Sequence, residues 1–221
     1  MPAPAALRQS PAALVTAAVV PLALAVADGI RLRRRLAAAG RDRLTGALRR
    51  ESWTPRAQRL LDRHPDQALL LICDLDHFKQ INDTCGHGVG DQVLAETTAR
   101  LTDWAGARGL VGRLGGDEFV AITLIEPRHR QLRLDHLIRL LAEPVTTDTG
   151  PVDVAASIGA ASAATTETTG LSELQRAADA ALYDGKHSGN AVLAGPRHAT
   201  MPSINGRRIG RPGTGIRGRA A

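Results

Sequence analysis

Four acidic side chains, gathered in two short segments, are the residues of this sequence best suited to chemistry. Asp74 and Asp76 follow an apolar run, and Asp117 and Glu118 follow two adjacent glycines. Carboxylates that converge raise each other's pKa unless a cation lies among them, and oxygen ligands of this kind suit Mg²⁺. Because Mg²⁺ completes its coordination with phosphate oxygens, the pattern indicates metal-assisted phosphoryl or nucleotidyl transfer.

The same carboxylates allow two simpler interpretations. A Gly-Gly-Asp-Glu turn on its own is most often a solvated hairpin tip, and only the earlier acidic segment favours a site. A calcium-binding loop that starts at Asp74 is excluded, because Phe78 takes its fifth position and the required glycine is missing from its sixth.

Buried strands must position these carboxylates. Residues 68–73 form a continuous apolar run, which predicts a central strand that ends at Asp74. Apolar runs at 109–114 and 119–124 flank the two glycines, so this part of the chain predicts a hairpin with the acidic pair at its tip. In one sheet, the strand end and the hairpin tip can lie side by side.

Other elements must cover this sheet. Apolar spacing predicts helices over 55–64, 89–104, 134–141 and 172–186, and a further strand over 152–158. Residues 86–90 are rich in glycine and are predicted to form a loop. The order of strands and helices predicts an α+β fold of the split βαβ kind, with helices packed on an antiparallel or mixed central sheet.

The charge of the chain is uneven. Residues 31–50 contain eight arginines and one acidic residue, and residues 192–221 contain six arginines and no acidic residue. The part between them has more acidic than basic residues, so the high pI comes from the flanks, which suit a membrane surface or an unstructured arm. Together with the 2% aromatic content, this argues against a nucleic-acid partner. Gly, Pro and Arg without periodicity predict a disordered basic tail over 193–221.

An uncharged, apolar stretch at residues 11–27 is followed directly by an arginine cluster at 31–35. This predicts a single-pass membrane anchor, and the arginines would keep the following domain in the cytoplasm. The alternative is a secretory signal, because Ala25-Val26-Ala27 matches the small-x-small pattern of a cleavage site. We therefore expect residues 1–41 to form a membrane anchor and an Arg-rich linker helix; without the anchor, the protein would be cytoplasmic.

Five motifs in this order make the sequence similar to the GGDEF-domain diguanylate cyclases. They are DRLTG at 42–46, DLDHFKQINDTCGHGVGD at 74–91, RLGGDEF at 113–119, SIG at 157–159 and ADAALYDGK at 178–186. The resemblance covers residues 42–192. It implies the ferredoxin-like palm fold of the nucleotidyl cyclases, and condensation of two GTP to cyclic di-GMP with release of two pyrophosphates.

The resemblance also implies roles for individual residues. Asp74, the carbonyl of Leu75 and Asp117 are the implied ligands of Mg²⁺, or of Mn²⁺ in its place, and Asp117 and Glu118 are the implied catalytic carboxylates. The implied substrate-binding residues are His77, Phe78, Lys79, Asn82, His87, Asp91, Gly115, Gly116 and Lys186. Asn82 and Asp91 would read the guanine edge, and the two lysines would meet the triphosphate.

The sequence departs from the family pattern at two places. Gly106 and Gly109 stand where many members carry the Arg and Asp of an upstream product-inhibition site, so we expect no such site here. Gly189-Asn190-Ala191 stands where the family has a Gly-Arg-Asn-Arg run, so one expected phosphate-binding arginine is missing.

The resemblance thus implies a small diguanylate cyclase. Each domain would hold one GTP, and two domains would face each other, so that catalysis requires a homodimer. The alternative is a catalytically silent, GGDEF-like module that binds GTP and regulates a partner. The intact acidic motifs count against this alternative, and the missing arginine counts for it.

Overall fold

The apolar run at 68–73 forms the centre of the sheet, as predicted. Strand β2 (Ala68–Asp76) is buried along all nine residues. It pairs antiparallel with β4 (Glu118–Leu124) on one side and with β7 (Ala155–Ala161) on the other. Because both neighbours supply backbone hydrogen bonds and both faces are covered, residues 68–73 of this strand are all apolar.

The sheet has six strands in the order β1-β3-β4-β2-β7-β8. Strand β3 (Leu110–Gly115) forms the predicted hairpin with β4. The edge strands β1 (Leu48–Arg49) and β8 (Ala191–Leu193) pair parallel with β3 and β7 respectively. The sheet is therefore mixed, with helices packed on it, and the predicted α+β palm-type fold is confirmed.

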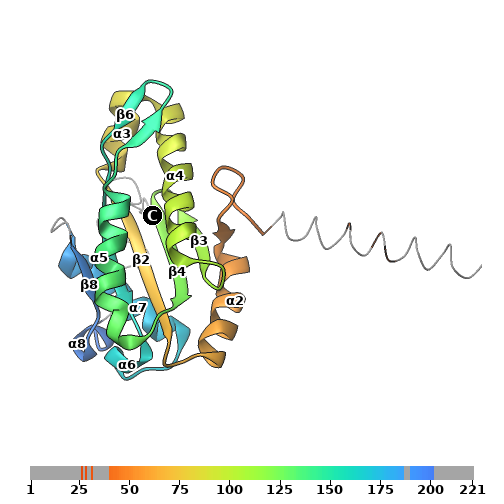
Figure 1. Ribbon diagram of the computed structural model, residues 1–221, viewed down its shortest axis with the longest axis vertical. Coiled ribbons are helices and arrows are strands. Elements are labelled where there is room, and N and C mark those ends of the chain that lie inside the picture. The colour runs from red at the N-terminus through yellow and green to blue at the C-terminus, as the bar shows by residue number, and fades with distance from the viewer. Residues whose placement is uncertain (1–25, 27, 29–30, 32–39, 187–189, 202–221) are drawn as a thin grey trace, which may run out of the picture. The chain divides into compact units, whose positions relative to one another are not determined.

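Helices cover both faces of this sheet (Figure 1). Helices α4 (His87–Ala105) and α5 (Arg130–Leu141) pack on the face that carries Leu69, Leu71 and Cys73. Helices α2 (Arg50–Arg63) and α7 (Leu171–Gly185) pack on the face that carries Leu70 and Ile72. Because side chains alternate along a strand, Asp74 continues the series that faces α2 and α7.

Shorter elements connect these layers. They are α3 (Phe78–Cys85), the 3₁₀ helix η1 (Pro127–His129), α6 (Ala163–Thr166), α8 (Pro196–Ala199) and a separate hairpin of β5 (Val145–Thr147) and β6 (Gly150–Val152). The strand predicted over 152–158 is confirmed for residues 155–158, but its start is wrong, because Val152 belongs to this second hairpin and β7 starts at Ala155.

Two further boundaries differ from the sequence prediction. Helix α2 starts at Arg50 and holds Pro55 in its interior rather than in its first turn. The predicted loop at 86–90 is wrong after Gly86, because α4 already begins at His87 and takes two glycines into its first turns. In both cases the packed apolar residues extend the helix beyond what local propensity favours.

The folded part also runs further toward the C-terminus than predicted. We expected residues 193–221 to be disordered, but β8 extends to Leu193 and α8 packs against α7 and α6. Parallel pairing with β7 and burial of Ala194 (1% exposed) stabilise this segment. The prediction is therefore wrong for residues 193–201, while residues 202–221 lie outside the described part of the chain.

The computed structural model describes residues 26, 28, 31, 40–186 and 190–201. The chain divides into two units, residues 1–40 and 41–221. The predicted membrane segment at 11–27 lies almost entirely outside the described residues. Among the helices that are described, none has the length and apolar character needed to cross a bilayer.

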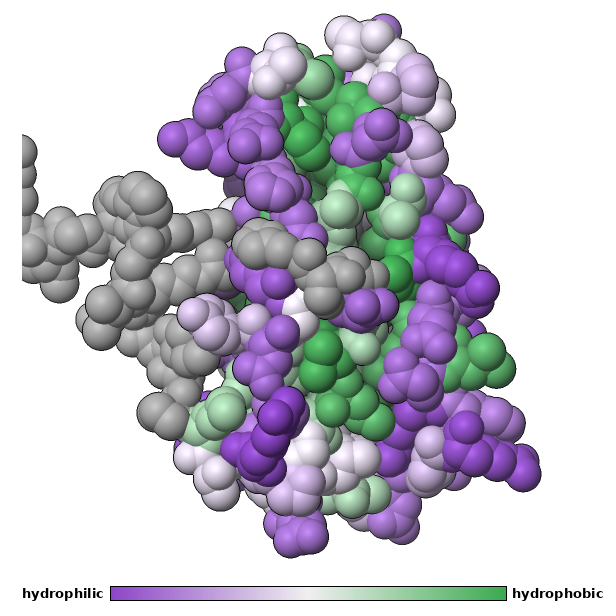
Figure 2. Space-filling model, turned by 90° about the vertical axis from the view of Figure 1, so that its left-hand side faces the viewer, coloured by the Kyte–Doolittle hydropathy of each residue, from purple (hydrophilic) through white to green (hydrophobic). Residues whose placement is uncertain are grey.

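One face of the molecule is mainly polar. Seen from the side on which α5 and β8 lie in Figure 1, hydrophilic residues predominate and hydrophobic ones reach the surface in a band between them (Figure 2). The large apolar side chains that are most exposed in the second unit, Leu132 on α5 and Tyr183 on α7, come from different helices. Single exposed apolar residues of this kind are normal in soluble domains.

Candidate active site

The structure brings the two acidic segments together at one end of the sheet. Asp74 lies directly opposite Glu118 in the β2–β4 register. The Leu75 amide donates a hydrogen bond to the Asp117 carbonyl oxygen at 3.3 Å, which ties the end of β2 to the hairpin tip. Both Asp74 and Asp117 are buried, with 3% and 8% of their surface exposed. A buried carboxylate is stable only beside compensating charge or donors.

Positive φ angles at two glycines shape the hairpin tip. Gly115 has φ 151° and Gly116 has φ 55°, and a β-bulge shifts the register between Arg113 and Gly115. L-residues rarely adopt these angles, so glycine is required for this turn. The turn places Asp117 immediately before β4, at the level of Leu75.

A lysine from the last helix reaches these carboxylates. The Lys186 ammonium donates a hydrogen bond to Asp74 Oδ1 at 2.9 Å. Lys186 follows the last residue of α7, and its side chain is 29% exposed. Three segments far apart in sequence, at 74, 117 and 186, therefore meet at the end of β2.

The pKa of Cys73 is raised by burial and by the negative charge in this region. Burial raises the pKa of the Cys73 thiol strongly, and the negative charges of Asp74, Asp76 and Asp117 raise it further. Asp76 differs from the other two, because its carboxylate accepts a hydrogen bond from the Ser157 hydroxyl at 2.9 Å. Asp74, which pairs with Lys186, and Asp117 thus lie at the same end of the sheet as Asp76.

This donor set fits a magnesium ion. Within the described residues, no three His, Cys, Asp or Glu side chains lie close enough together to hold a metal. Mg²⁺ does not need such a cage, because it is usually bound by one or two carboxylates together with substrate phosphates and water. The ammonium of Lys186 already occupies a cation position beside Asp74. Asp74, Asp117 and the Leu75 carbonyl would hold the ion, with Glu118 next to them.

The other predicted substrate-binding residues lie on α3 and the start of α4, directly after β2. His77 adopts the left-handed conformation (φ 55°) between β2 and α3, and its carbonyl accepts the Gln80 amide at 2.8 Å. Phe78 packs partly against the core, while Lys79, His87 and Asp91 are exposed to solvent. Lys79, His87 and Asp91 are therefore accessible to a ligand. The packing of Phe78 against the core fixes the position of α3.

Gly90 is a residue of this region that the sequence analysis missed. In α4 it faces Asn82 of α3, and a Cβ at Gly90 would overlap the Asn82 amide oxygen and lie 3.3 Å from the Phe78 ring. A side chain at position 90 would therefore displace the Asn82 amide. The sequence signal was the glycine-rich segment 86–90, which predicted a loop rather than a close contact between two helices.

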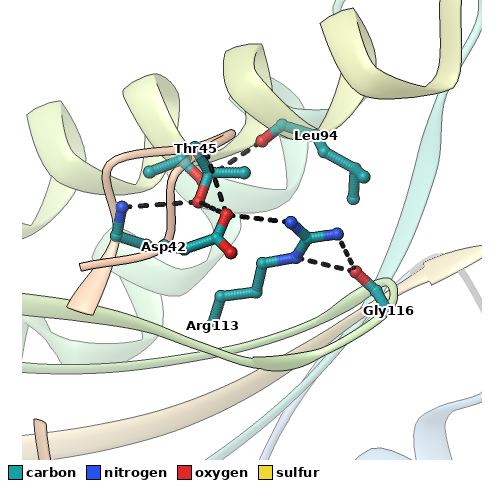
Figure 3. Close-up of polar contacts among 7 residues, drawn as sticks. Asp42, Thr45, Leu94, Arg113 and Gly116 are labelled. Atoms are coloured by element: carbon teal, nitrogen blue, oxygen red, sulfur yellow. Dashed lines mark hydrogen bonds and ion pairs between the residues drawn. The ribbon is translucent and has the colours of Figure 1, made fainter. Parts of the chain in front are cut away.

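A polar network connects the start of the domain to the hairpin tip (Figure 3). Arg113 donates from Nε and Nη2 to the Gly116 carbonyl, at 2.9 and 2.7 Å, and from Nη1 to Asp42 Oδ1 at 2.9 Å. The same Asp42 oxygen accepts the Thr45 amide and hydroxyl, at 3.0 and 2.8 Å. Asp42 and Thr45 precede β1, so the network ties the domain entrance to the turn that carries Asp117. The sequence analysis assigned no role to Arg113.

The network changes the titration of Asp42. Partial burial by itself would raise the pKa of Asp42, but the hydrogen bonds from Thr45 and Arg113 and the charge of Arg113 outweigh it and hold this pKa below its usual value. The ionised form of Asp42 is therefore favoured in the folded state.

Asp42→Asn is expected to lower the free energy of unfolding at pH 7 by about 1 kcal/mol, the net contribution of a hydrogen bond. Because the pKa of Asp42 is lowered on folding, this stabilisation is present above the unfolded pKa of about 4 and is lost as the pH falls through the folded pKa. Denaturant titrations at pH 7 and pH 3 measure the difference. Asp62→Asn, at an exposed carboxylate that accepts one bond from Gln58, is the control. An equal loss at both pH values would contradict the assignment.

The fold and the site define the class of this protein. A mixed sheet with carboxylates at the end of its central strand and at an adjacent hairpin tip is the palm-type nucleotidyl cyclase arrangement. The family model described as diguanylate cyclase, GGDEF domain, matches residues 39–191. The chain therefore belongs to the GGDEF-domain family.

Individual relatives agree with this assignment. An uncharacterized 19.3 kDa protein of Streptomyces ambofaciens is 44% identical over 171 residues, which cover 77% of this chain and 91% of the relative. The probable diguanylate cyclase DgcC of Escherichia coli is 35% identical over 156 residues, but the match spans only 41% of its length and 67% of this chain. The GGDEF domain of PA1120 from Pseudomonas aeruginosa superposes with a TM-score of 0.65, at 31% identity, over 72% of this chain and 96% of that domain.

Proposed function

We propose that this protein is a diguanylate cyclase that condenses two GTP into cyclic di-GMP and two pyrophosphates. The observation that carries the proposal is the meeting of two buried carboxylates, Asp74 and Asp117, with the Lys186 ammonium at the end of the central strand. Membership in the GGDEF family supports the same reaction.

The bound Mg²⁺ would lower the pKa of the attacking 3′-hydroxyl and stabilise charge on the phosphates. Asp74, Asp117 and the Leu75 carbonyl would bind the ion, and Glu118 would add negative charge beside it. Lys79 and Lys186 would neutralise the triphosphate, which fixes the α-phosphate for in-line attack. Because Lys186 is paired with Asp74, its ammonium would move only from a carboxylate to a phosphate oxygen.

Asn82 and Asp91 would select guanine. A carboxylate that accepts from the ring N–H and the exocyclic amine of guanine finds no matching donors on adenine. Asn82 lies on α3 and Asp91 on α4, at the point where Gly90 faces Asn82. His87 starts α4 and would lie beside the bound nucleotide.

The reaction needs two nucleotides, and one domain would hold one. We therefore propose that two chains face each other as a homodimer during catalysis. The solved coiled coil and GGDEF domain of DgcB from Caulobacter crescentus, 26% identical with a TM-score of 0.65, is a structure in complex with c-di-GMP.

We propose no product-inhibition site upstream of the hairpin in this chain. Gly109 closes a tight turn in which a Cβ would lie 2.6 Å from the Ala105 carbonyl oxygen.

The decisive experiment is incubation of the purified protein with GTP and Mg²⁺, followed by chromatography for cyclic di-GMP. We expect cyclic di-GMP and pyrophosphate from GTP and no cyclic product from ATP. GTP binding without product, at high protein concentration, would instead identify the silent GTP-binding module, which the missing arginine near Asn190 favours. Product from ATP alone would refute the roles of Asn82 and Asp91.

Gly90→Ala is expected to raise the KM for GTP at least about fivefold and to reduce the preference for GTP over ATP. The added methyl group would displace the Asn82 amide, and a lost hydrogen bond in a desolvated pocket costs about 1–3 kcal/mol. The melting temperature should change little, because the amide can rotate away. Initial rates with both nucleotides measure the effect.

Gly88→Ala is the matched control. Gly88 lies in the same turn of α4, and a Cβ there would meet nothing within 4 Å. This variant should keep the KM of the unaltered protein. Equal KM values for the two variants would show that Gly90 does not position Asn82.

The membrane anchor at residues 11–27 stays a prediction. We propose that it holds the catalytic domain at the cytoplasmic face of the cell membrane. A mature N-terminus at Asp28, detected by mass spectrometry of the native protein, would instead identify a cleaved signal.

A further inference from the structure

The last described segment of the chain makes a specific contact with the end of α7. His198 on α8 is buried, with 3% of its surface exposed. Its Nδ1 accepts the Gly195 amide hydrogen at 2.9 Å, so its Nε2 carries the ring proton and donates to Asp184 Oδ2 at 3.2 Å. Arg197 donates to the same oxygen at 3.1 Å. Two side chains of residues 195–201, here called the C-terminal segment, therefore bind the Asp184 carboxylate.

Without these partners, the negative charge of Asp184 would be unfavourable at its position in the helix. It lies in the last turn of α7, where the helix dipole disfavours negative charge, and that turn contains no basic residue of its own. Its carboxylate is 32% exposed. The C-terminal segment supplies the donors that the helix lacks.

Asp184 is also two residues from Lys186. On a helix, side chains two residues apart point in different directions. Lys186 has φ −58° and ψ 129°, which is not a helical conformation, so this separation does not hold between Asp184 and Lys186. An Asp184 carboxylate without partners would attract the Lys186 ammonium. In the structure this ammonium lies on Asp74 instead, at 2.9 Å.

We propose that the C-terminal segment positions Lys186. His198 and Arg197 bind the Asp184 carboxylate, so that the Lys186 ammonium binds Asp74 and the substrate phosphates instead of Asp184. His198 is thus a positioning residue and does not touch substrate. The proposal rests on the GTP-binding part of the proposed function.

The C-terminal segment lies outside residues 39–191, the part of the chain that the family model matches. The chain also lacks the arginine expected beside Asn190, so fewer cations are available for the triphosphate. The position of Lys186 therefore matters more when that arginine is missing.

The test measures GTP affinity by calorimetry in the presence of Mg²⁺, in the full-length protein. His198→Ala should raise the Kd about twofold to fivefold, the range that a partly exposed ion pair is worth. Asp184→Asn alone should leave the Kd near that of the unaltered protein, because the amide does not compete for the lysine. In the double variant, Asp184→Asn should restore the affinity that His198→Ala loses.

This restoration separates positioning from mere stabilisation. If the segment only held α7 in place, Asp184→Asn would weaken the remaining Arg197 contact, because a neutral amide oxygen accepts a weaker hydrogen bond from a guanidinium than a carboxylate does, and GTP binding would weaken further. Arg197→Ala, at a side chain that is 70% exposed, tests the same point without a cavity and should raise the Kd by a smaller factor. Arg128→Ala, which breaks the exposed Arg128–Glu126 pair on η1, is the matched control.

An unchanged Kd in both His198→Ala and Arg197→Ala, or no restoration by Asp184→Asn, would overturn the proposal. GTP binding without cyclic di-GMP formation would refute the cyclase activity and leave this test intact. Absence of GTP binding by the unaltered protein would refute both.

Discussion

Asp117→Ala is expected to lower the rate of cyclic di-GMP formation by about a thousandfold or more. Asp117 is buried at the hairpin tip, and the hydrogen bond from the Leu75 amide to its backbone carbonyl ties this residue to the end of β2, where Asp74 lies. Removing one of two carboxylate ligands of a catalytic metal forfeits several kcal/mol of transition-state stabilisation, and about 4 kcal/mol corresponds to a thousandfold. Initial rates with GTP and saturating Mg²⁺ measure the loss.

Asp62→Asn controls for the loss of one negative charge. Asp62 is exposed near the C-terminal end of α2, which lies close in sequence to the start of β2 and not to the end that carries Asp74. Its substitution should leave the rate unchanged. If Asp117→Ala kept more than about a tenth of the activity, a role for this carboxylate in metal binding would be ruled out.

Gly159→Ala is expected to lower the free energy of unfolding by about 3 kcal/mol and the melting temperature by about 6–12 °C. Gly159 lies on β7 beneath α7, where a Cβ would overlap the Ala178 carbonyl oxygen and the Leu182 backbone nitrogen. Both obstacles are helix backbone, which cannot rotate away as a side chain can. Helix α7 would have to move off the sheet, and thermal denaturation followed by circular dichroism measures the result.

The displacement of α7 also predicts a loss of activity at temperatures where the variant is still folded. Lys186 follows α7 directly, so a shift of the helix moves its ammonium away from Asp74. Gly88→Ala again serves as the control, because its methyl group would lie in open space. A melting temperature within about 2 °C of the unaltered protein would show that α7 adapts to the methyl group.

The expected effect of a glycine-to-alanine substitution depends on which atoms surround the glycine. At Gly90 the obstacle is the end of a side chain, so we expect altered specificity with little loss of stability. At Gly159 the obstacle is backbone, so we expect lost stability first. Sequence reasoning cannot separate these cases, because both glycines occur in regular elements and both contacts come from other segments.

Much of the fold was accessible to sequence reasoning because its patterns are local. The apolar run before Asp74 predicted β2, and the two glycines between apolar runs predicted the β3–β4 hairpin. The errors lie where packing extended an element beyond its local signal. Helix α4 took in the glycines after Gly86, and β8 and α8 formed in a segment whose composition favours disorder.

The candidate site also combines features that follow from local sequence with features that depend on packing. The sequence by itself determined the carboxylates, the glycine turn and the family, because residue type and spacing are enough to identify them. Only the tertiary structure placed Arg113 between Asp42 and the Gly116 carbonyl, Gly90 against Asn82, and the C-terminal segment on Asp184. Each of these contacts joins separate elements. They form only because the hydrophobic faces of the helices and the sheet dock in one arrangement, which no local pattern specifies.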